Sequence, residues 1–251
     1  MSTKEEIYWK NQINLGNILI QRSSKILLLQ NIGLLILAIS VLSFDPLIVP
    51  LIAKLIPLIL LMDIIGFFLL GIGFFFLGKI NEQTEKDGKY ILLMSCSWIF
   101  LTILWRGGPI YNLRELNQST PGLILFGLWI PSLVLLISII YKIKKVLSVL
   151  YYHVNTTIYN LYLVLTLVFL ALFILLIINL FLQPTGTEEV FITREALLFI
   201  FLLFLKTVVI TIIGSIMFNK LRHDALLIIA RLPDSIETSD SKNKLKEKSS
   251  L

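Results

Sequence analysis

The chain has 251 residues, of which 57% are hydrophobic and only 15% are charged. Soluble domains carry about 25% charged residues, so water is not the main solvent of this chain. The single cysteine, Cys96, excludes an intramolecular disulfide and any metal site built from several cysteines. The net charge of +6 follows the apolar runs along the chain, as described below, and therefore does not indicate nucleic-acid binding.

The N-terminal segment, residues 1–25, mixes charged, polar and apolar residues. Ser2 and Glu5 fit a capping box, which predicts a helix start near Thr3. We expect an interfacial helix lying on the membrane, with Tyr8 and Trp9 at headgroup depth. A loosely ordered N-terminus is the alternative.

Six apolar runs follow, and about 20 such residues are needed to cross a hydrocarbon core about 30 Å thick. They predict an all-α fold in which residues 26–218 form a bundle of six transmembrane helices. The predicted spans are residues 26–44, 55–78, 90–105, 121–141, 158–182 and 196–218. Residues 45–54 contain two prolines and are expected to be a kinked connection rather than a seventh span.

The distribution of Lys and Arg predicts the orientation of the bundle. Most of the 22 Lys and Arg residues flank the spans on the side that holds both termini, and the opposite side has only Lys54, Arg106, Arg114 and Arg194. Cytoplasmic loops carry the excess of Lys and Arg, so both termini are expected in the cytoplasm. A composition rich in Ile, Leu and Lys suits the plasma membrane of a prokaryote.

The chain after the last span is expected to leave the membrane on the cytoplasmic side. Residues 219–233 predict a short juxtamembrane amphipathic segment, which Pro233 ends. Residues 234–251 are rich in Ser, Lys and Glu and predict a disordered basic tail. Its lysines can attract anionic lipid at about 1 kcal/mol each near the surface, and a simply solvated tail is the alternative.

Two charged residues lie inside predicted spans, Asp63 in the second and Lys206 in the last. A charge at the centre of a spanning helix costs about 2.5–3.5 kcal/mol, so each side chain is expected to face protein or water. Both lie about 12–15 Å from the outer start of their span at 1.5 Å per residue. Opposite sign and matching depth predict an ion pair. A structural role in helix packing is favoured over a proton or ion relay, and the third alternative is that the two residues do not pair.

Small residues predict where the helices touch. Thr207, Thr211 and Ser215 recur at intervals of four and form a polar stripe next to Lys206. Such a stripe suits close helix packing, which is favoured, or a narrow polar path.

In the second span, Gly66 and Gly73 are seven residues apart, as are Gly71 and Gly78, and each pair predicts a smooth patch for a neighbouring helix. Pro131, in the middle of the fourth span, predicts a kink.

The spans contain no constellation for chemistry. The chain has no phosphate-binding loop of the GxxxxGK[ST] type, no HExxH zinc pair and no GxSxG nucleophile turn. We therefore expect no catalytic residue, no metal site, no cofactor and no enzymatic activity.

Three classes of function stay open, of which a membrane-embedded enzyme is the weakest because the spans contain no acid–base or nucleophile constellation. The first is a non-catalytic subunit, scaffold or lipid- or partner-interaction protein, which works in the bilayer with a membrane protein partner or as a homo-oligomer. The second is a small-solute or ion transporter or channel with Asp63 and Lys206 in its interior path. Because a solute path needs more polar lining than these spans offer, the sequence favours the first class.

Overall fold

A computed structural model describes residues 3–42, 49–107, 120–150, 155–182, 201–202 and 204–227, with side chains over slightly narrower ranges. These residues form six helices and no strand, which confirms the predicted all-α fold. The helices are α1 (Thr3–Leu42), α2 (Val49–Gly78), α3 (Glu82–Gly107), α4 (Thr120–Leu150), α5 (Thr157–Leu182) and a last helix, Phe204–Leu227.

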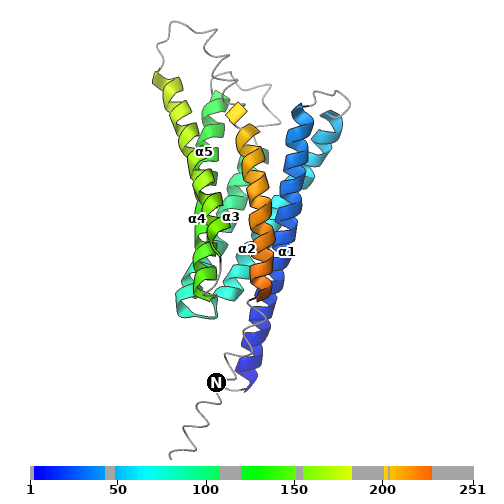
Figure 1. Cartoon of the computed structure of the whole chain (residues 1–251), viewed down its shortest axis with the longest axis vertical. Helices are drawn as coiled ribbons and strands as arrows, with labels where there is room; N and C mark the ends of the chain where they lie inside the picture. The colour runs from blue at the N-terminus through cyan, green and yellow to red at the C-terminus, as the bar shows by residue number, and fades with distance from the viewer. Residues whose placement is uncertain are drawn as a thin grey trace, which may run out of the picture.

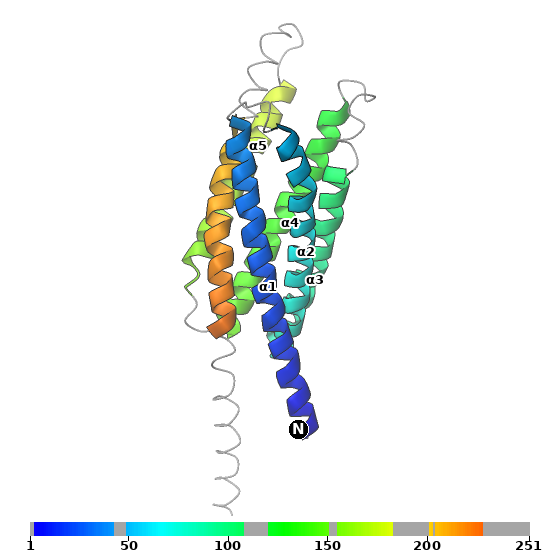
Figure 2. The ribbon, with the colours of Figure 1, turned by 90° about the vertical axis from the view of Figure 1, so that its right-hand side faces the viewer.

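The helices run side by side in an elongated bundle, and consecutive helices pack against one another (Figure 1). The last helix lies next to α1, as both views show (Figures 1 and 2). The α2–α3 turn, the start of α1 and the end of the last helix lie at the same end of the bundle. We call this the basic end, because it gathers Lys79, Lys86, Lys89, Lys142, Lys144, Lys145, Lys220 and Arg222.

Five helices in the described part of the chain are long and apolar enough to cross a membrane: Lys10–Ile39, Leu55–Gly78, Glu82–Leu104, Thr157–Leu175 and Phe204–Leu227. The second of these has the predicted bounds. α4 covers the predicted span 121–141 but is not one of the five, and its end carries Lys142, Lys144 and Lys145. In length and composition these helices fit an integral membrane protein.

Several helices start earlier or end later than the predicted spans. α3 starts at Glu82 rather than at residue 90, because Oδ1 of Asn81 accepts a hydrogen bond from the backbone N–H of Gln83 at 3.0 Å and caps the helix. Residues 49–54, expected as a connection, are the first turns of α2. Pro50 fits there because the first turn of a helix needs no backbone donor.

α1 is one helix of 40 residues, about 60 Å long at 1.5 Å per residue. The expected boundary between an interfacial segment (1–25) and a first span (26–44) is not a break in this helix. Small residues explain why. A Cβ on Gly16 would lie only 2.9 Å from the carbonyl oxygen of Gly73, and Oγ of Ser23 donates to the carbonyl of Gly66 at 2.8 Å. Residues 16–25 therefore run along α2, and the predicted interfacial position of the segment stays a prediction.

The two glycine pairs of α2 serve two different neighbours, which confirms that each pair is a helix-packing patch. Gly66 and Gly73 face α1, and a Cβ on Gly73 would lie 2.7 Å from the side chain of Ile20. Gly71 and Gly78 face α3 in the same close manner. The seven-residue spacing keeps each pair on one face of α2, so this helix holds α1 on one side and α3 on the other.

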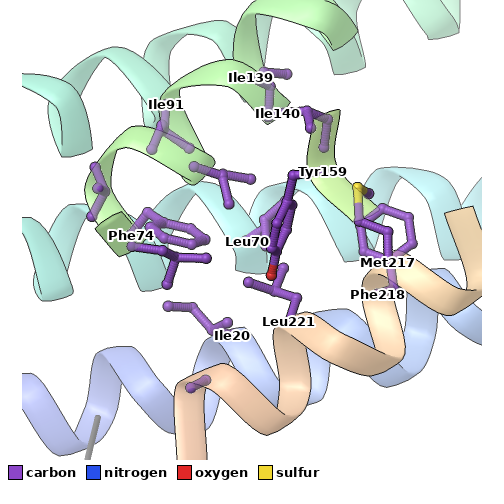
Figure 3. Close-up of a cluster of buried hydrophobic side chains, with 14 of the residues drawn as sticks. Ile20, Leu70, Phe74, Ile91, Ile139, Ile140, Tyr159, Met217, Phe218 and Leu221 are labelled. Carbon is purple, nitrogen blue, oxygen red and sulfur yellow. The ribbon is translucent and has the colours of Figure 1, made fainter. Parts of the chain in front are cut away.

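The apolar core lies nearer the basic end, and all six described helices contribute to it (Figure 3). The labelled side chains are Ile20 of α1, Leu70 and Phe74 of α2, Ile91 of α3, Ile139 and Ile140 of α4, Tyr159 of α5, and Met217, Phe218 and Leu221 of the last helix. This shared core joins the first and last helices and makes the bundle one packed unit.

Two further sequence predictions concern proline and the C-terminal region. α4 continues through Pro131 as one helix, so the proline does not end it. The last helix continues through residues 219–227 without a break, past the predicted end of the span at residue 218. Residues 228–233 and the predicted disordered tail, 234–251, lie outside the described residues.

Replacing Gly16 or Gly73 with alanine is expected to destabilise the bundle by about 1–3 kcal/mol, because the new methyl group would press on the neighbouring helix backbone. Gly33→Ala is the matched control, since the nearest atoms there are the movable side chain of Ile59 at 3.2 Å. Thermal unfolding in one detergent measures the difference. Equal unfolding midpoints for the three variants would contradict the described packing of α1.

Candidate functional site

Three pairs of small or polar residues recur at intervals of seven along α1: Gly16–Asn17, Ser23–Ser24 and Gln30–Asn31. Seven residues are close to two helical turns, so the six residues lie along one side of the helix. All six are buried. α1 therefore carries a polar stripe, defined by these three pairs, into the interior of the bundle.

The polar stripe has a sequence signal that the predicted helix boundaries obscured. The signal is the repeat of neighbouring small or polar residues every seven positions in a helix. A boundary at residue 26 assigns the first two pairs to an interfacial segment and the third to a span, so the repeat is lost. Once α1 is seen to be continuous, the repeat identifies its buried side.

Asp63 lies in the interior, level with the Gln30–Asn31 pair. Two contacts between α1 and α2 give this alignment. A Cβ on Gly66 would meet Leu27, and a Cβ on Gly33 would meet Ile59, so Asp63 lies between these two contacts along the helix pair. Asp63 is only 2% exposed. As expected for a charge inside a span, its side chain faces protein.

Helices α1, α2, α5 and the last helix meet around Asp63. The carboxylate of Asp63 interacts electrostatically with the buried hydroxyl of Tyr162 on α5. Gly214 of the last helix lets its neighbours approach, because a Cβ there would lie 2.9 Å from Nδ2 of Asn31 and 3.3 Å from the ring of Tyr162. We call Asn31, Asp63, Tyr162 and Gly214 the central polar cluster.

Lys206 lies on the last helix eight residues before Gly214. That separation is about 12 Å along the helix axis, away from the basic end. A direct contact with Asp63 therefore requires the lysine side chain to extend along the helix toward Gly214. The Asp63–Lys206 ion pair stays a prediction.

The predicted polar stripe of the last helix satisfies its hydroxyl groups within the helix itself. Oγ1 of Thr211 donates to the carbonyl of Thr207, and Oγ of Ser215 donates to the carbonyl of Thr211 at 2.8 Å. These hydroxyls therefore add little bulk to the surface of the helix on either side of Gly214. This pattern fits the predicted packing role.

Two buried carboxylates near the basic end hold helices together. From the sequence, the lysines that pair with them were interpreted only as positive charges that flank the spans. Asp87 of α3 accepts hydrogen bonds from Lys142 and Lys145 of α4, the latter at 2.9 Å. The carboxylate raises the pKa of Lys145, because it stabilises the ammonium group. Asp87 thus fixes the end of α4 against α3.

Asp224 of the last helix is the second of these carboxylates. It accepts a hydrogen bond from the hydroxyl of Tyr159 at 2.9 Å and one from Nζ of Lys220 at 2.9 Å. In Figure 3 the hydroxyl oxygen of Tyr159 points away from α5 toward Leu221 of the last helix. Because this charge is compensated by Lys220 and by the tyrosine, Asp224 joins α5 to the last helix.

The described residues also form a hollow of about 460 Å³ near the basic end, lined by Glu82, Gln83, Lys86, Asp87, Tyr90 and Lys145. Within the described ranges, no group of three or more His, Cys, Asp and Glu residues could hold a metal ion.

No protein-family model, no curated protein and no solved structure matches this chain. Its function therefore has to be argued from the residues and their arrangement.

Tyr159→Phe is expected to destabilise the bundle by about 1.5–3 kcal/mol, because Asp224 loses a hydrogen bond to a buried charged group. Tyr141→Phe is the matched control, since Tyr141 is 53% exposed. Unfolding of both variants in the same detergent measures the difference. A Tyr159→Phe protein as stable as the control would show that the Tyr159–Asp224 bond does not hold α5 in place.

Proposed function

We propose that this integral membrane protein moves a small cation, most simply a proton, across the bilayer and that Asp63 binds it. The supporting observation is the central polar cluster, in which a buried carboxylate lies where four helices meet. Ionisable residues inside membrane spans are rare because burying a charge in the bilayer is energetically costly, and those that occur typically mark proton or ion pathways.

The chemistry of the cluster suits reversible cation binding. A carboxylate in a medium of low dielectric constant gains strongly from binding a proton or cation, which removes its charge. The Tyr162 hydroxyl both donates and accepts hydrogen bonds, and the Asn31 amide does the same. The chemistry of these two groups therefore suits a nearby carboxylate in both its charged and its neutral state.

We also propose that the basic end faces the cytoplasm. The support is the excess of Lys and Arg at that end, which follows the rule for cytoplasmic loops. In this orientation both termini are cytoplasmic and Asp63 lies near the middle of the crossing.

The other class of function, a scaffold or interaction subunit without catalysis, rests on the apolar outward faces of the helices. Leu93 and Phe100 on α3, each 63% exposed, are examples. Such faces suit lipid as well as a partner, so they do not favour this class over cation movement. A negative transport result would support this scaffold or interaction class.

Proton flux into liposomes tests the proposal. With a pH-sensitive dye inside and a potassium diffusion potential as driving force, the wild-type protein is expected to acidify the lumen faster than empty liposomes do. Asp63→Asn should lower this flux about tenfold or more, because the binding carboxylate is lost. Glu85→Gln is the matched control: Glu85 is a partly exposed carboxylate paired with Lys89 at 2.6 Å, and its loss should leave the flux unchanged.

Two results would contradict the proposal. One is a wild-type flux no higher than that of empty liposomes under both signs of the potential. The other is an Asp63→Asn flux equal to that of wild type in protein shown to be folded. Either result, with a stable partner found by cross-linking, would support the interaction class.

A further inference from the structure

Asn17 and Ser24 are buried polar residues whose hydrogen-bonding groups are unused within the described part of the chain. Asn17 is 0% exposed, and neither Nδ2 nor Oδ1 has a hydrogen-bond partner. Ser24 is 1% exposed, and its Oγ has none. A buried amide or hydroxyl left in this way costs about 1–3 kcal/mol, so buried polar groups are normally satisfied by protein or by internal water.

These two residues lie on the way from the basic end to Asp63. Gly16, next to Asn17, packs on Gly73 and Leu77, close to the α2–α3 turn. Ser24 follows one repeat later and Asn31 another, at about 10 Å of helix rise each. The polar stripe therefore runs from the basic end to the central polar cluster.

We propose that Asn17 and Ser24 hold internal water molecules that connect the basic end to Asp63, and that the cation is a proton. A metal ion would need several oxygen ligands to replace its hydration shell. The stripe offers amides and hydroxyls, and Asp63 is the carboxylate it leads to. A proton needs only hydrogen-bonded water. The carboxylate takes a proton from a hydronium ion, which becomes a neutral water molecule.

Beyond the level of Asp63, the side of α1 that carries the polar stripe becomes apolar. Ala38 occupies the same position of the seven-residue repeat, two repeats after Ser24, and is apolar and 5% exposed. Water is therefore expected on the side of the basic end and not around Ala38. The destination of the water chain rests on the proposed function, but the hydration of Asn17 and Ser24 does not.

Oxidation by hydroxyl radicals tests the hydration, because the radicals form from water at the site. The full chain carries Cys96→Ser together with either Ser24→Cys or Ala38→Cys, in lipid nanodiscs, and thiol oxidation is followed by mass spectrometry. Both thiols are buried and lie on the same side of α1, so burial alone predicts equal rates. The proposal predicts oxidation at position 24 about tenfold faster than at position 38, because exposure to oxidant governs thiol oxidation. Equal rates would overturn it.

A second measurement uses the wild-type protein and does not depend on how the cysteine variants fold. Magnetisation transfer from water to the side-chain amide of Asn17 is recorded by solid-state NMR in lipid, with the signal assigned by its loss in Asn17→Leu. Transfer to this buried amide supports the proposal, and no transfer overturns it. Hydration without any wild-type proton flux would leave the water sites standing and remove the proposed function. A proton flux that depends on Asp63, together with no hydration at Ser24, would support the proposed function and overturn the proposed water sites.

Discussion

The close packing of α1 on α2 and on the last helix is the interaction on which the rest of the structure depends. Inside a bilayer there is no bulk water to satisfy a polar side chain, so the polar stripe of α1 is tolerated only if protein covers it. Gly16 and Gly73 let the two backbones approach on one side, and Gly214 does so on the other. The close approach of the helices at these glycines therefore allows Asn17, Ser24 and Asn31 to be buried inside the bundle.

Three buried carboxylates lie in the described part of the bundle, two near the basic end and one at the centre. Asp87 of α3 is paired with Lys142 and Lys145 of α4, and these pairs join two helices. Asp224 is paired with Lys220 of its own helix and joins α5 by accepting a hydrogen bond from Tyr159. Asp63 belongs to the central polar cluster, where its carboxylate acts electrostatically on the Tyr162 hydroxyl. The carboxylates near the basic end fix helix packing, and the proposal of cation binding concerns the carboxylate that is buried where four helices meet.

Features that depend on one helix at a time were predictable from the sequence. The second span, the glycine patches of α2 and the burial of Asp63 all follow from periodicity and from the cost of charge in lipid. Features that depend on the relative height of two helices were not. The packing of Gly214 against Asn31 and Tyr162, which sets the height of the last helix, could not be derived from periodicity, and the Asp63–Lys206 ion pair stays a prediction. The Tyr159–Asp224 bond joins residues 65 positions apart and has no local signal.

The central claim is that the buried Asp63 carboxylate exchanges a proton with the basic end of the bundle. Infrared difference spectroscopy on the protein in lipid tests this directly, by following the C=O stretch of protonated carboxyl groups after a change of pH. We predict a band that responds to pH within the range where the protein stays folded and that is missing in Asp63→Asn. A spectrum in which Asp63→Asn and wild type show the same carboxyl bands at every pH would contradict it.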